Sequence, residues 1–201
     1  MNMIQPGDQI SNPISGETIV FETTGLERPD AVLRAECIVK PGGRLAAPLM
    51  HVHPIQTETF WILEGQLHTV VNGFERVYKA GEKVVIEPGV PHLWGNASQT
   101  EKVRFTFELS PGLQWATLFE SIFAMARDGL TKPDGAPPIL AMAAGLHQFK
   151  DHFYLDKPPV AVQKIMFAVL APIAKLAGYR NVYTYFPDAR ATILSSQARV
   201  Q

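Results

Sequence analysis

The residues best suited to chemistry lie in one short segment, His51-Val52-His53-Pro54-Ile55-Gln56-Thr57-Glu58. Residues i and i+2 of a strand point to the same face, so His51 and His53 are predicted to present two imidazoles side by side. A short connection then places Glu58 at the start of the next predicted strand. Two imidazoles and a nearby carboxylate are a set of groups that can bind a metal ion.

A third histidine follows a predicted tight turn, Pro88-Gly89-Val90-Pro91-His92. Either histidine motif alone is usually incidental, and the turn histidine is most often simply solvated; it is their ordered combination that favours metal binding. Three imidazoles and one carboxylate suit a borderline divalent metal such as Fe, Mn, Co, Ni, Cu or Zn. On an octahedral ion, these four ligands would leave open positions for water, dioxygen or substrate.

The elements that must position these side chains are short β-rich runs separated by turn signals. Asn72-Gly73 is a strong hairpin signal between two of them. Short strands at this spacing predict an antiparallel sandwich or barrel. The predicted strands cover residues 32–40, 58–63, 66–71, 74–79, 83–86 and 103–109.

The pattern changes to helical periodicity near Ser110-Pro111. Helical spacing of apolar residues predicts a helix over 114–127, and a further helix over 160–176 begins after prolines and contains Pro172. A short apolar segment, 139–149, lies between them. The sequence therefore predicts a β-domain over 1–110 followed by a helical extension over 111–201.

Composition excludes several classes of protein. The chain has 201 residues with 18 basic and 19 acidic side chains, a balance that argues against a nucleic-acid binder. Its one cysteine cannot form an internal disulfide. The N-terminus lacks the pattern of a signal peptide, and the longest apolar stretch would span only about 15 Å as a helix, about half of a bilayer core. We therefore expect a cytoplasmic protein that does not enter a membrane.

The two histidine motifs together resemble those of the cupin superfamily. The first runs from Gly43 through the histidine pair and the glutamate to Gly65, and the second from Gly81 to Asn96. Gly43 lies earlier than in the usual family spacing, and Glu87 stands where the family usually has its first proline. The resemblance implies a mainly β, cupin-type barrel or jelly roll. It also implies one divalent transition metal inside the barrel, held by His51, His53, Glu58 and His92.

Resemblance to quercetin dioxygenase-like cupins further implies an O₂-dependent oxidation of a small aromatic or dicarbonyl-type compound. Glu58 would then be both a metal ligand and the catalytic base, because a carboxylate near a cation can accept a substrate proton. Fold does not fix function. The alternatives are a non-catalytic, metal-containing module that binds or senses a small ligand, and a barrel that a metal stabilises.

Two further expectations concern the surroundings of the site. Phe60 and Ile62 share a strand face with Glu58, and Trp94 shares one with His92, so all three are candidates for a substrate pocket, with core packing as the alternative. The helical extension carries many apolar side chains that must be covered by the barrel, by a second subunit or by both. We therefore expect a homodimer.

Overall fold

Two antiparallel sheets form the body of the molecule. The computed structural model describes residues 4–43, 50–149 and 152–186. In spatial order, the six-stranded sheet contains β1 (Gln9–Ser11), β2 (Glu17–Thr24), β3 (Leu33–Val39), β10 (Val103–Ser110), β5 (Thr57–Glu64) and β8 (Lys83–Ile86). The five-stranded sheet contains β11 (Tyr154–Leu155), β4 (His51–Val52), β9 (His92–Asn96), β6 (Gln66–Val71) and β7 (Phe74–Lys79).

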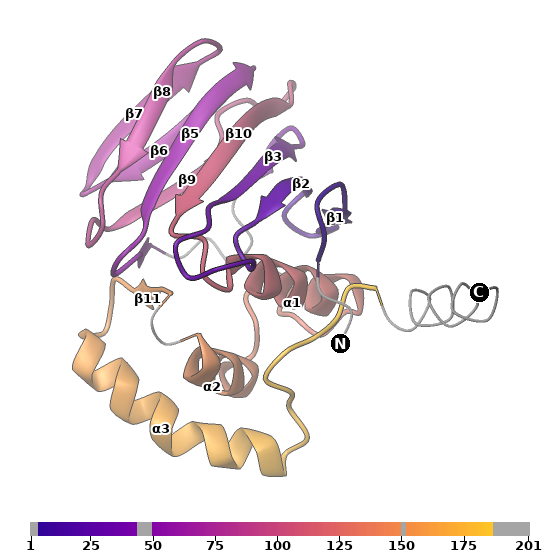
Figure 1. Cartoon of the computed structure of the whole chain (residues 1–201), viewed down its shortest axis with the longest axis vertical. Coiled ribbons are helices and arrows are strands. Elements are labelled where there is room, and N and C mark those ends of the chain that lie inside the picture. Colours follow the sequence, from indigo (N-terminus) through magenta and orange to yellow (C-terminus); the bar gives the residue numbers. More distant parts are fainter. Residues whose placement is uncertain (1–3, 44–49, 150–151, 187–201) are drawn as a thin grey trace, which may run out of the picture.

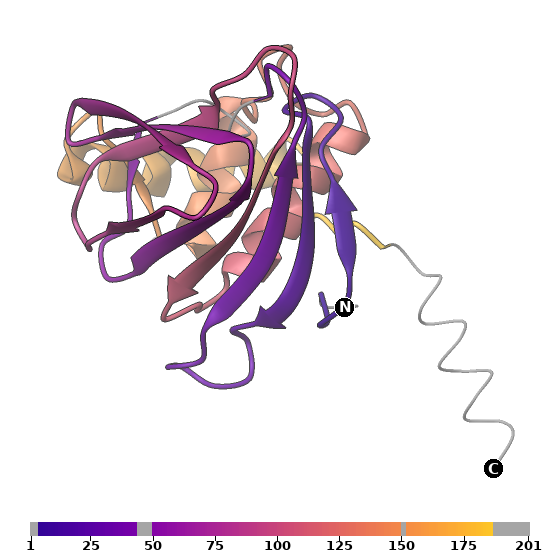
Figure 2. The same cartoon turned by 90° about the horizontal axis from the view of Figure 1, so that it is seen from above.

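Within the described residues, three helices follow the barrel strands. They are α1 (Trp115–Arg127), α2 (Ile139–Gln148) and α3 (Val160–Leu176). All three lie at one end of the barrel, with α1 next to the strands and α3 farthest from them (Figure 1). Seen from above, the strands curl round one another with the helices behind them (Figure 2). The predicted mainly β barrel with a helical extension is therefore confirmed.

Several elements match the sequence prediction closely because their signals are local. The β6–β7 hairpin turns at Asn72 and Gly73, whose φ angles are 50° and 80°, as the primed turns of tight hairpins require. The predicted helix over 160–176 is α3, with Pro172 inside it. The predicted strand ranges do not include β1, β2, β4, β9 or β11, although strand parity was assumed for the side chains on β4 and β9. Residues 187–201 of the predicted extension lie outside the described part of the chain.

Alternation of side chains places one face of each sheet in the core. Along β3, buried and partly buried residues alternate without interruption. The aromatic rings of Phe60, Trp94 and Phe105 meet edge to face between the two sheets, with centroids 5.2–5.9 Å apart. On the outer face, Arg34 pairs with Glu22 and Glu108. This side of the six-stranded sheet is thus apolar inside and charged outside.

The helical extension is attached to the barrel by packing and by a strand. The ring of Phe119 on α1 lies 5.5 Å from that of Phe107 on β10. Ala143 of α2 and Phe167 of α3 form a separate small core. Strand β11 pairs antiparallel with β4, where Leu155 is the partner of His51. A strand from the extension therefore lies directly beside the predicted metal ligands.

A buried glutamine holds this strand against α3. Gln163 is fully buried; its amide donates to the carbonyls of Leu155 and Pro158 at 2.7 and 2.5 Å, and its oxygen accepts the Leu155 N–H at 3.1 Å. The short strand β11 thus has its backbone groups satisfied on both sides. Within the described residues, none of the helices has both the length and the apolar character needed to cross a membrane.

Candidate metal centre

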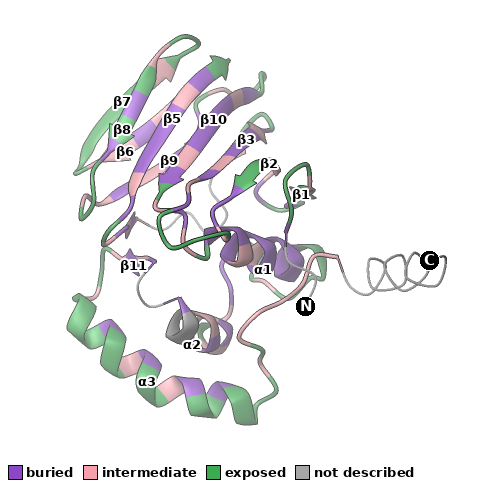
Figure 3. Cartoon of the chain, in the orientation of Figure 1, coloured by how far each residue is buried: buried purple, intermediate pink, exposed green. Residues whose placement is uncertain are grey.

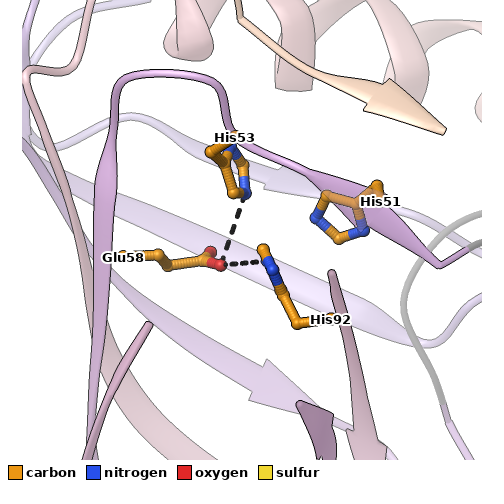
Figure 4. Close-up of side chains that lie close together, drawn as sticks. All are labelled: His51, His53, Glu58 and His92. Carbon is orange, nitrogen blue, oxygen red and sulfur yellow. Dashed lines mark ion pairs between the residues drawn. The ribbon is translucent and has the colours of Figure 1, made fainter. Parts of the chain in front are cut away.

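Four predicted ligands converge at one point inside the barrel. One ligand atom from each of His51, His53, Glu58 and His92 lies within 4.8 Å of the others. The four residues are 8%, 2%, 4% and 0% exposed, so the cluster is shielded from bulk water. Figure 4 shows the three imidazoles arranged around the Glu58 carboxylate. Three nitrogen donors and one oxygen donor at this spacing can surround a single ion.

Strand pairing brings the four residues together from separate parts of the sequence. His51 on β4 is the register partner of His92 on β9. Glu58 on β5 pairs with Ile86 at the end of β8, just before the turn that leads to His92. In that turn, the N–H of Gly89 donates to the carbonyl of His53 at 2.8 Å. Gly89 has a φ of 81°, a conformation that favours glycine.

The orientation of His92 is fixed by its own backbone. Its Nδ1 lies 2.9 Å from the carbonyl oxygen of Val90. A carbonyl can only accept, so Nδ1 carries the proton and Nε2 is left with its lone pair toward the cluster. Outer hydrogen bonds of this kind fix the tautomer and ring orientation of metal-binding histidines.

The unsatisfied atoms of the cluster fit a metal ion. Nε2 of His92 and Nε2 of His53 lie 2.9 and 3.4 Å from the same oxygen, Oε2 of Glu58. None of these three buried atoms has a hydrogen-bond partner of good geometry among the described residues. Leaving a buried polar atom unpaired costs about 1–3 kcal/mol. One divalent cation among them would satisfy all three, so the donor set fits such an ion.

Electrostatics of the cluster favour its ionised groups. Burial by itself raises the pKa of Glu58, but the adjacent His53 and His92 outweigh it and hold the pKa well below its usual range. Burial lowers the pKa of His92, and its contact with Glu58 more than reverses this, so its pKa is raised. The carboxylate is therefore charged at neutral pH, as a metal ligand must be.

Aromatic side chains from the helical extension close the cluster. The ring of Trp115, at the start of α1, lies 4.8 Å from that of His53. The ring of Phe153, just before β11, lies 6.4 Å from that of His51. The predicted helix over 114–127 included Trp115, but no sequence signal placed it against a histidine about sixty residues earlier. Only packing could reveal these two contacts.

The three predicted pocket residues lie deeper in the barrel. Phe60, Ile62 and Trp94 are 0%, 2% and 6% exposed and belong to the main hydrophobic core. Phe60 and Trp94 contact each other with ring centroids 5.9 Å apart. The structure thus places them among core residues, and a role in substrate binding stays a prediction.

The site lies within a segment that matches a known family. Residues 35–108 match the family described as Cupin domain, and this range contains all four ligands. This part of the chain is therefore a cupin domain. The match covers the strands from β3 to β10 and the ligand cluster, and it leaves β1, β2, β11 and the helices outside.

Individual relatives are more distant. An oxidoreductase from Arthrobotrys oligospora is 32% identical over 132 residues, which cover 62% of this chain and 50% of that protein. The chain thus spans about half the length of this curated relative. Among solved structures, a sugar phosphate isomerase of the cupin superfamily from Silicibacter pomeroyi is 17% identical, with a TM-score of 0.43 over 51% of this chain and 70% of that one. A double-stranded β-helix protein from Klebsiella pneumoniae is 24% identical, with a TM-score of 0.39 over 55% and 84%.

Proposed function

We propose that this cupin is a metal-dependent oxidoreductase that uses dioxygen to oxidise a small aromatic or dicarbonyl-type compound. It would bind one divalent transition metal through His51, His53, Glu58 and His92. The observation that carries the proposal is the buried set of donors whose unsatisfied atoms converge on one point. The similarity to an oxidoreductase supports the choice of reaction class.

The bound metal would supply Lewis acidity and open coordination positions for the reactants. The protein's own groups do the rest. The carboxylate of Glu58, ionised at neutral pH, would accept a proton from an acidic substrate group. The hydrogen bond from His92 to Val90 keeps the Nε2 lone pair of that ring facing inward. Trp115 and Phe153 exclude water from this end of the barrel.

Metal analysis tests the first half of the proposal. Protein purified without chelator is expected to contain about one transition-metal ion per chain, and His53→Ala and His92→Ala are expected to lose it. His68→Ala is the matched control, because this histidine lies on the other face of β6 with its side chain 33% exposed and pairs with Glu75. Full metal content in both cluster variants would exclude this site.

Oxygen consumption tests the second half. The metal-loaded protein is tested in an oxygen electrode against a panel of enols and catechols. We expect uptake that depends on one of these compounds and disappears in Glu58→Gln. A protein that binds metal and ligand but never consumes oxygen is instead a binding or sensing module.

We also propose that the protein forms a homodimer through α3. Much of this helix is exposed (Figure 3). The exposed apolar residues at helical spacing are Val162, Ile165, Val169, Ile173 and Leu176. The outer face of the six-stranded sheet, by contrast, carries ion pairs of Arg34 and Arg104. A second copy is therefore better accommodated on α3 than on that sheet.

A further inference from the structure

An apolar cavity of about 110 Å³ lies between the end of the barrel and the helical extension. Helices α1 and α2, the segment around Phe153 and residues 180–183 form its walls. Among the side chains that line it are Trp115, Phe119, Ile122, Met142, Phe149 and Phe153. Small apolar cavities of this kind can bind apolar ligands.

The cavity shares a wall with the candidate metal centre. His51 belongs to the ligand cluster and also lines the cavity. Trp115 and Phe153 line it too, and their rings lie 5.8 Å from each other. The ring of Trp115 in turn lies 4.8 Å from the ring of His53, measured between centroids. A molecule held in the cavity would therefore lie against the imidazole of His51.

The lining carries one unsatisfied donor. Trp115 is 5% exposed, and its indole N–H has no hydrogen-bond partner among the described residues. A buried donor without a partner is costly to the folded protein. A ligand with a hydrogen-bond acceptor would remove that cost, and such an acceptor would fix the orientation of the ligand in an otherwise apolar site.

We infer that this cavity is a binding pocket for a neutral, apolar compound about the size of one aromatic ring, with one acceptor for the Trp115 N–H. Identification of that compound as the substrate rests on the proposed function. Size limits the ligand to about one ring, because the cavity of about 110 Å³ is smaller than an engineered cavity of about 150 Å³ that binds benzene. The helical extension, rather than the barrel, then selects the substrate.

The charges on the lining favour a neutral ligand. Arg180 is exposed at the rim, and Glu17, which also lines the cavity, is buried. An ionised group inside would lose its hydration to apolar walls, which is far costlier than burying a neutral group. A carboxylate-bearing analogue of a good ligand is therefore expected to bind much more weakly.

Calorimetric titration of the full chain tests the pocket with three probes of similar size: acetophenone, ethylbenzene and benzoate. Gly145 on α2 lines the cavity, and a Cβ built there meets only the carbonyl oxygen of Asn181, at 3.7 Å. Gly145→Met therefore adds a side chain that fills the cavity. Ala168→Met on the exposed part of α3 is the matched control.

Acetophenone is expected to bind the wild type at least tenfold more tightly than benzoate. Gly145→Met should weaken its binding at least tenfold, and Ala168→Met should leave it within twofold. Trp115→Phe should weaken acetophenone about fivefold more than ethylbenzene, because only acetophenone accepts a hydrogen bond. No binding of acetophenone up to its solubility limit, or no effect of Gly145→Met, would overturn the inference. If benzoate bound more tightly than acetophenone and lost that binding in Arg180→Ala, the inference that the ligand is neutral would be overturned.

Each titration is repeated after chelation, which separates this inference from the proposed function. Binding of acetophenone to a protein that never takes up metal leaves the pocket standing and removes the proposed function. Metal-dependent oxygen uptake that Gly145→Met does not affect leaves the proposed function standing and removes the cavity as its substrate pocket.

Discussion

Replacing Gly145 with alanine should make the protein more stable and its cavity smaller. Gly145 lies inside α2, and its carbonyl accepts the N–H of Phe149 at 3.0 Å. Its φ is outside the left-handed region, and the added Cβ would come no closer than 3.7 Å to any neighbour. Alanine therefore fits without strain, and both helix propensity and burial act in its favour.

The expected gain follows from two contributions. Glycine inside a helix is about 0.5–1 kcal/mol less favourable than alanine. Fully burying a methyl group gains about 0.8 kcal/mol, of which a half-buried position gives roughly half. The sum is about 1–1.5 kcal/mol. In a chain of this size, 1 kcal/mol shifts Tm by about 2–4 °C, so Tm should rise by about 3–5 °C.

Thermal and urea unfolding of the wild type and the variant measure this gain. Gly129→Ala is the control, because Gly129 follows α1 with a φ of 69° and open space around its Cβ. There the same substitution should destabilise the protein by about 1–2 kcal/mol, since only backbone strain changes. A loss of stability in Gly145→Ala would refute the placement of this residue inside a helix beside a cavity.

Four further results are expected. Chelation should lower the Tm of the wild type by about 5–10 °C, because a metal at 100 times its Kd stabilises the folded protein by about 2.7 kcal/mol. The Tm of His92→Ala should not change with the chelator. Metal occupancy should fall below about pH 6, because imidazoles must be neutral to bind a metal. The raised pKa of His92 lets protons compete with the metal at higher pH than usual. Flat occupancy between about pH 5 and 8 would contradict this. Gln163→Leu should cost about 2–4 kcal/mol in urea unfolding, because both backbone groups of Leu155 lose a partner; a change below about 0.5 kcal/mol would show that β11 is held otherwise. Light scattering should give twice the chain mass for the wild type and the single mass for Ile165→Glu, and equal masses would rule out α3 as the interface.

The sequence alone was enough to predict the features that depend on near neighbours in the chain. The β6–β7 hairpin follows from Asn72-Gly73 between two β-rich runs, and α3 follows from its prolines and its apolar spacing. The cluster of His51, His53, Glu58 and His92 was also predictable, because strand parity and the order of the motifs restrict where these side chains can point. For the hairpin and the helix the physical signal lies within a few residues, whereas the cluster was predicted from the ordered combination of two motifs that are distant in the chain.

Tertiary structure alone decided what surrounds the ligands. Strand β11 has only Tyr154 and Leu155, too few residues for a periodicity, and it exists because β4 offers unpaired backbone groups and Gln163 satisfies the other side. The contact of Trp115 with His53, and the cavity between α1 and α2, arise from the way the helices pack on the barrel end. Such packing depends on shape complementarity between distant segments, which hydrophobic periodicity does not encode.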